Sequence, residues 1–142
     1  MAAIDKSQTA LRIIGDDLDP DEISRILGKA PTNAERKGHV IRSQSRGRER
    51  TAMTGGWRLR AENCCPEDVN GQVAQILSGM TADTDIWREL TSKYRVDMFC
   101  GLFMRVSNEG LALSPDTMLE LGRRGIKIDF DIYAPFTEKA AD

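Results

Sequence analysis

The chain has 142 residues, of which 40% are apolar and 30% charged, and its formal net charge is −2. This length is enough for one domain with a hydrophobic core, and the slight negative charge argues against a general nucleic-acid binder. The sequence shows no secretory signal and no apolar run near 20 residues, so we expect neither secretion nor a membrane span. Three cysteines, two of them adjacent, suit a reducing cytoplasm better than a disulfide framework.

The first elements are marked by local signals. Residues 1–8 read as a loose N-terminus, and 9–14 as a strand stopped by Gly15. Asp19 has the character of a helix N-cap, Pro20 suits the first helical position, and Gly28 suits a left-handed exit. These signals predict a helix from Pro20 to about Gly28, and they explain the acids of 16–22 without a ligand.

Residues 36–56 form the most unusual segment, a connection rich in arginine. The basic residues, with Glu49 as the single acid among them, are Arg36, Lys37, Arg42, Arg46, Arg48 and Arg50. Only Val40 and Ile41 could form a short strand there. One interpretation is a basic arm for nucleic acid or an acidic partner. We favour a long, solvated hairpin loop, because no aromatic residue is interleaved for base stacking.

In the rest of the chain, stretches with the two-residue period of strands alternate with stretches with the 3.6-residue period of helices. We predict a strand at 57–62, a helix opening at Pro66, a helix capped by Asp83 or Thr84, and a long strand at 96–106. A helix at 115–124 should place Met118, Leu119 and Leu121 inward. In the last strand, 126–133, we expect an inward row of Ile126, Ile128, Phe130 and Ile132. Residues 136–142 should be frayed.

The run Leu113-Ser114-Pro115-Asp116, with Leu121-Gly122 after it, echoes the first helix start and predicts two related β-α-β halves. The predicted fold is one α+β domain over 9–135. Its sheet should be largely antiparallel, with four or five strands and helices mainly on one face, resembling a ferredoxin-like arrangement.

The candidate binding residues lie on the polar faces of these strands. If the faces coincide, Arg58 and Arg60 lie near Asp129 and Asp131, with Arg105 also available. Cross-strand charge pairing and a binding face both explain such residues. Two carboxylates on one strand could also ligate a metal, but the spacing nominates no third ligand. With His39 as the only histidine, in the basic loop, we assign no catalytic residue, metal site or cofactor.

Several motifs together resemble a known family. They are Gly15-Asp16, Leu18-Asp19-Pro20-Asp21-Glu22-Ile23, Ile26-Leu27-Gly28, Pro31-Thr32, Lys37-Gly38, Gly56-Trp57-Arg58-Leu59, Leu113-Ser114-Pro115-Asp116 and Asp131-Ile132-Tyr133. In this order they resemble the bacterial domain of unknown function 4279 family, from about residue 11 to 133. The resemblance implies a small cytoplasmic bacterial α+β domain, and it brings no catalytic residues with it.

We therefore expect a non-enzymatic module that binds a protein or a ligand. One alternative is a small metal-dependent enzyme using Asp129, Asp131 and the acids of 16–22. Another is a nucleic-acid contact through Arg42, Arg46 and Arg48 of the basic loop, which the net charge disfavours. A protein partner of unknown identity and a homodimer are both compatible with this expectation.

Overall fold

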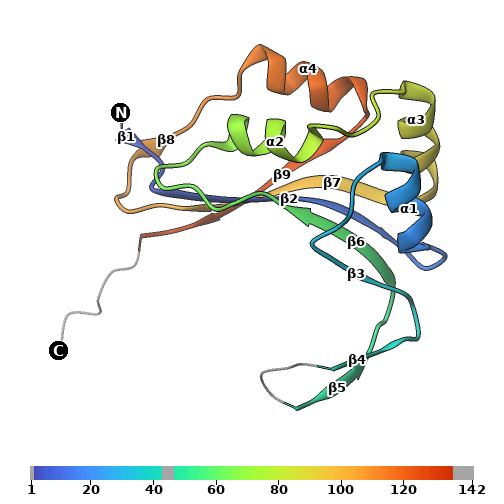
Figure 1. Cartoon of the computed structure of the whole chain (residues 1–142). Coiled ribbons are helices and arrows are strands. Elements are labelled where there is room, and N and C mark those ends of the chain that lie inside the picture. Colours follow the sequence, from blue (N-terminus) through green and yellow to red (C-terminus); the bar gives the residue numbers. More distant parts are fainter. Residues whose placement is uncertain (1, 43–46, 136–142) are drawn as a thin grey trace.

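The computed structural model of the protein describes residues 2–42 and 47–135. Its centre is a five-stranded sheet in the order β3-β6-β2-β7-β9, and four helices described with it all lie on one face (Figure 1). The strands are β2 (Lys6–Gly15), β3 (Asn33–Glu35), β6 (Gly55–Arg60), β7 (Arg95–Phe103) and β9 (Lys127–Tyr133). The helices are α1 (Pro20–Leu27), α2 (Val69–Leu77), α3 (Thr84–Lys93) and α4 (Pro115–Arg123). The predicted α+β class is confirmed.

All neighbouring strands are antiparallel except β7 and β9, which are parallel. Two strand–helix–strand units follow from this order. In β7-α4-β9 the two strands are adjacent, whereas in β2-α1-β3 the strand β6 lies between them. Both units nevertheless return to a strand parallel to their first, as the echoed helix starts indicate.

Two small sheets accompany the main one. Strand β1 (Ala2–Ala3) pairs in parallel with β8 (Glu109–Gly110), and β4 (Val40–Arg42) forms a hairpin with β5 (Glu49–Thr51). The predicted loose N-terminus is therefore wrong. Ile4 is buried, its N–H donates to Gly110 O at 3.1 Å, and β2 already begins at Lys6. The predicted frayed C-terminus, 136–142, lies outside the described residues.

The start and end of α1 are those expected from its sequence. Asp19 Oδ1 accepts from the Asp21 N–H at 3.0 Å, and Gly28 has φ +79° with its N–H donating to Ser24 O. The inward residues Ile23 and Leu27 are buried. Because local hydrogen bonds and backbone preferences set both ends, this helix could be predicted without knowing the sheet.

The core lies between the sheet and the helices, and Trp57 belongs to it. Its side chain is fully buried, and its Nε1 donates to Ser24 Oγ at 3.0 Å. The core also encloses a polar residue, Gln72 of α2. Its Oε1 accepts from Ser7 Oγ at 2.7 Å and Thr9 Oγ1 at 2.8 Å. Its Nε2 donates to the carbonyls of Ser7 and Glu62, so the buried amide is fully satisfied.

Two predicted element boundaries are wrong. Helix α2 begins at Val69, not Pro66, because Asp68 provides the cap by accepting from the Gly71 N–H at 3.0 Å. Strand β7 ends at Phe103, where its partner β9 also ends, and Val106 is exposed. Among the described residues, no helix has the length and apolar character needed to cross a membrane.

The inward faces of α4 and β9 also differ from the prediction. Thr117 and Leu121 make the buried stripe of α4, while Met118 and Leu119 are 54% and 60% exposed. Phe130 and Ile132 of β9 are 39% and 58% exposed. They lie on the helix side of the sheet, but the C-terminal end of β9 runs beyond α4, and no described helix covers it (Figure 1).

Candidate functional site

The bare face of the sheet presents side chains in rows that cross several strands. The first row runs Asn33, Arg58, Arg12, Asp97 and Lys127, from β3 across to β9. The next row is Arg60, Ala10, Phe99 and Asp129, and below it Gln8, Gly101 and Asp131. These residues alternate with the core positions of the same strands, so they all point away from the helices. The open face therefore carries four of the eight candidate residues, Arg58, Arg60, Asp129 and Asp131.

Arg12 and Asp97 form the centre of this face. Arg12 Nε donates to Asp97 Oδ1 at 2.8 Å, and Nη2 donates to Oδ2 at 2.6 Å, which is a bidentate pair. The guanidinium also lies 4.3 Å from the centroid of the Phe99 ring. Burial would raise the pKa of Asp97, but the hydrogen bonds donated by Arg12 outweigh it, and the pKa lies below its ordinary value.

A hollow of about 300 Å³ opens beside this pair, towards β6. Its lining residues are Gln8, Thr9, Ala10, Arg12, Arg58, Arg60, Ala61, Asn63 and Phe99. The small side chain of Ala10, which lies between Arg60 and Phe99 across the strands, forms the floor of this hollow. Neither Arg58 nor Arg60 has a carboxylate within 4.0 Å among the described residues, so the hollow has two cationic side chains available to a ligand.

Asp129 and Asp131 lie on the opposite side of the face, which corrects the predicted neighbourhood. Strands β2 and β7 separate β6 from β9, so these acids are about 14 Å from the arginines at ordinary strand spacing. Asp131 Oδ2 accepts from Tyr133 Oη at 2.7 Å, and Asp129 is 3.6 Å from Lys127 Nζ. The face thus has a cationic side at β6 and an acidic side at β7 and β9.

Aromatic rings continue the face towards the end of β9. Phe103 and Tyr133 stack with centroids 4.6 Å apart, and Lys6 Nζ lies 5.1 Å from the Phe103 centroid. Arg105 is not on the strand. It lies in the connection after β7, exposed, where its backbone N–H donates to Glu109 Oε1. The structure therefore does not bring Arg105 together with Arg58 and Arg60.

The basic segment is a hairpin whose arginines are largely paired. Arg42 donates to Glu49 across the hairpin at 2.8 Å, and Arg50 pairs with Glu35 of β3. Arg48 is exposed, and Arg46 lies outside the described residues. The predicted strand at 40–41 exists as part of β4, but it pairs with β5 in a separate small sheet. The strand from this part of the chain that joins the main sheet is β3. These contacts leave fewer arginines available to a polyanion than the composition indicates.

The acids of the 16–22 turn make ion pairs with basic residues of the chain. Arg36 lies 2.8 Å from Asp19 and 2.9 Å from Asp21, and Lys37 donates to Asp16 at 3.1 Å. The hydrogen bond from Lys37 holds the pKa of Asp16 below its ordinary value. In residues 2–42 and 47–135, no group of three His, Cys, Asp or Glu side chains is placed to hold a metal ion.

Among the described residues, the three cysteines and His39 do not come together in one site. Cys100 is buried in β7, and burial raises its pKa to about 11. Burial also raises the pKa of Cys64, while Cys65 is exposed. His39 is exposed beside the hairpin. These positions supply no paired nucleophile and base within the described chain.

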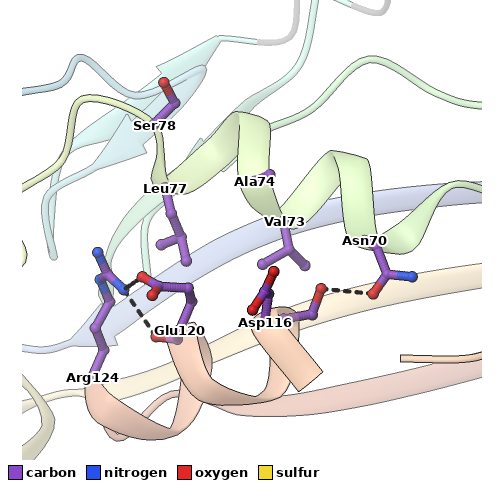
Figure 2. Close-up of a pocket in the computed structure, with 9 residues that line it drawn as sticks. Asn70, Val73, Ala74, Leu77, Ser78, Asp116, Glu120 and Arg124 are labelled. Atoms are coloured by element: carbon purple, nitrogen blue, oxygen red, sulfur yellow. Dashed lines mark hydrogen bonds and ion pairs between the residues drawn. The ribbon is translucent and has the colours of Figure 1, made fainter. Parts of the chain in front are cut away.

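A second hollow, of about 270 Å³, lies between α2 and α4 on the helix side (Figure 2). Val73 and Leu77 line one wall, and the buried Arg124 donates from Nη1 to Glu120 Oε2 at 2.6 Å. Arg124 Nε has no partner among the described residues. Asn70 accepts from Thr117 Oγ1 at 2.6 Å, so most polar atoms here bond one another. We interpret this hollow as a gap in the packing between α2 and α4, in which Arg124 Nε is the one buried nitrogen without a partner among the described residues.

Sequence reasoning missed Arg12, Asp97 and Phe99, which form the centre of the face. Their signal was present, because Arg12 lies between the buried Leu11 and Ile13, and Asp97 between Val96 and Met98. Strict alternation places such residues on the face opposite the core. Their contact could not be inferred, because it depends on β2 and β7 being neighbours.

The geometry defines a class: a small α+β domain with a helix-covered face and a bare, charged face. A family model described as a domain of unknown function (DUF4279) matches residues 5–135. The chain belongs to this family, as the resemblance of its motifs indicated. Neither a search of curated proteins nor one of solved structures returned a match.

Proposed function

We propose that the protein is a non-enzymatic binding module whose open sheet face docks a partner protein. The observation that carries this is the pair Arg58 and Arg60, which line a hollow and have no carboxylate partners among the described residues. Arginines of the helices and the hairpin such as Arg25, Arg42 and Arg88 each pair with a carboxylate, whereas Arg58 and Arg60 lie on one face of one strand with none.

The composition of the face favours a protein over a small molecule. Arginine and aromatic residues are enriched in the cores of protein–protein interfaces, and here Arg12, Phe99, Phe103 and Tyr133 lie among polar neighbours. The hollow is open to solvent rather than enclosed, whereas small-molecule sites bury most of their ligand. A broad partner surface fits this shape better.

The charge distribution also indicates what the partner carries. An acidic side chain of the partner would enter the hollow between Arg58 and Arg60, where two guanidinium groups can donate to it. About 14 Å away, a basic side chain would lie over Asp129. Complementary charges of this kind set orientation and association rate. The predicted partner surface is therefore dipolar.

The test compares three baits in an affinity purification from lysate of the source organism, with mass spectrometry. The baits are the wild type, Arg58→Glu with Arg60→Glu, and a control in which Arg25→Glu and Arg88→Glu change exposed arginines on α1 and α3. Circular dichroism checks that each bait is folded.

We expect a stoichiometric partner with the wild type and the control, and at least a tenfold loss with the Arg58/Arg60 variant. Hydrogen exchange of the complex should then show protection in β6 and β2. Equal recovery by all three baits, or protection confined to the helix side, would remove the proposal. Retention of a small anion or of nucleic acid alone would replace the protein partner by that ligand.

A further inference from the structure

Strand β9 is an open edge of the main sheet. It is last in the strand order and pairs with β7 along one side only, among the residues described. Tyr133 O accepts from the Met104 N–H at 3.1 Å, so the backbone groups of Tyr133 turn towards β7. By alternation, those of Ile128, Phe130 and Ile132 turn outward. An unprotected edge of this kind is a template for another strand.

The side chains at this edge are also incompletely covered. Phe130 and Ile132 are 39% and 58% exposed on the helix side, and Met118 and Leu119 of the neighbouring α4 are 54% and 60% exposed. Exposed apolar side chains on adjacent elements mark an interaction surface. The apolar alternation of β9 predicts that Phe130 and Ile132 are buried. Contact with another chain at this edge would bury them, whereas a free edge leaves them exposed.

The charges of β9 complement those of the same strand reversed. In antiparallel pairing about a two-fold axis at Asp129, Lys127 of each copy lies opposite Asp131 of the other. Ile128 then lies opposite Phe130 in the hydrogen-bonded pairs. The two opposite-charge pairs outnumber the single Asp129–Asp129 pair, and each such pair contributes a few tenths to about 1 kcal/mol.

Other registers are less favourable. An axis at Phe130 places Asp129 opposite Asp131 twice, which is repulsive. An axis at Ile128 pairs only three residues of β9, whereas the axis at Asp129 pairs five. We propose that β9 pairs with β9 of a second copy of this chain, antiparallel and in the Asp129-centred register, to form a homodimer with a continuous ten-stranded sheet.

Sedimentation equilibrium of the full chain tests this surface through a charge swap. We expect the wild type and the control Lys93→Glu, on the exposed side of α3, to be dimers. Lys127→Glu alone and Asp131→Lys alone should be monomers, because each places like charges opposite one another. The double variant Lys127→Glu, Asp131→Lys should recover the dimer. A wild type that stays monomeric at all concentrations, or a dimer unaffected by both single changes, overturns the proposal.

Cross-linking tests the register. Asp129 faces its own copy in a non-hydrogen-bonded pair, where the Cα atoms lie about 4.5 Å apart, within the range of a disulfide. In a background with Cys64→Ser and Cys65→Ser, we expect Asp129→Cys to form a covalent dimer on oxidation, and Ile132→Cys to form none. Cross-linking at 132 in place of 129 would overturn this register.

Discussion

Arg12 of β2 and Asp97 of β7 lie directly opposite each other in antiparallel register, joined by two hydrogen bonds on the open face. Asp97→Asn should lower the free energy of unfolding at pH 7 by about 1–3 kcal/mol, because a hydrogen-bonded charge pair is lost and Arg12 is left without its carboxylate. Urea denaturation measures this, with Asp85→Asn on the exposed surface of α3 as the control.

The same pair predicts part of the acid sensitivity. Because the pKa of Asp97 is lowered in the folded state, its contribution is present above its unfolded pKa, near 4, and is lost as the pH falls through the lower folded value. The wild type should lose stability between about pH 4 and 2 more steeply than Asp97→Asn. Parallel stability profiles over that range would contradict this assignment.

Gln72 is the buried polar residue on which two β2 hydroxyls and two carbonyls depend. Gln72→Leu leaves Ser7 Oγ and Thr9 Oγ1 without their amide acceptor, and should cost about 2–4 kcal/mol. Gln75→Leu, an exposed change on the same helix, is the matched control and should change stability little. Thermal unfolding of both variants makes the comparison. Equal melting temperatures would show that the amide network does not stabilise the fold.

Replacing glycine by alanine should change the stability of the fold in opposite directions at two positions. A Cβ at Gly55 would lie 2.6 Å from Gly15 O and 3.1 Å from Leu18 Cβ, so Gly55→Ala should destabilise by about 1–3 kcal/mol. A Cβ at Gly122, near the end of α4, meets nothing within 4 Å. Gly122→Ala should stabilise by up to about 1 kcal/mol, because alanine favours the helix. Chemical denaturation of the two variants reports both signs, and a shared sign would contradict the placement of β6 or α4.

The three thiols should differ in reactivity. Cys65 is exposed, burial raises the pKa of Cys64, and Cys100 is buried with its pKa raised to about 11. Because the thiolate is the reactive form, iodoacetamide at pH 8 should modify Cys65 first and Cys64 more slowly. Cys100 should react only in denaturant. Mass spectrometry of the native and unfolded chain follows each site, and rapid native labelling of Cys100 would argue against a central β7.

The sequence was informative where structure depends on neighbours in the chain. Asp19 and Ser114 cap their helices as expected, and of the two candidates for α3 the cap is Asp83, because each acceptor and its amides lie within three residues. The strand order depends on contacts up to about ninety residues apart, such as Thr9 with Cys100. Without that order, Arg58 and Arg60 were placed near Asp129 and Asp131, and the Arg12–Asp97 pair was missed.

The alternation of apolar residues along a strand also does not show how much of the strand a neighbouring helix covers. Phe130 and Ile132 continue the alternation of Ile126 and Ile128, but α4 covers only the first part of β9. In α4, Met118 and Leu119 are more apolar than Thr117, yet Thr117 lies on the buried face with Leu121, and its hydroxyl donates to Asn70 there. Gln72 follows Val69 by three residues, so the helical stripe itself indicated that its side chain would be buried.

Because helices cover only one face, β2 changes its tolerance to substitution from one residue to the next. In a scan that measures abundance and partner binding separately, changes at Leu11 and Ile13 should reduce abundance. Changes at Gln8 and Ala10 should leave abundance intact and alter binding. Along this strand, residues that determine folding would then alternate with residues that determine binding, and Arg12, which stabilises the fold through its pair with Asp97, would contribute to both.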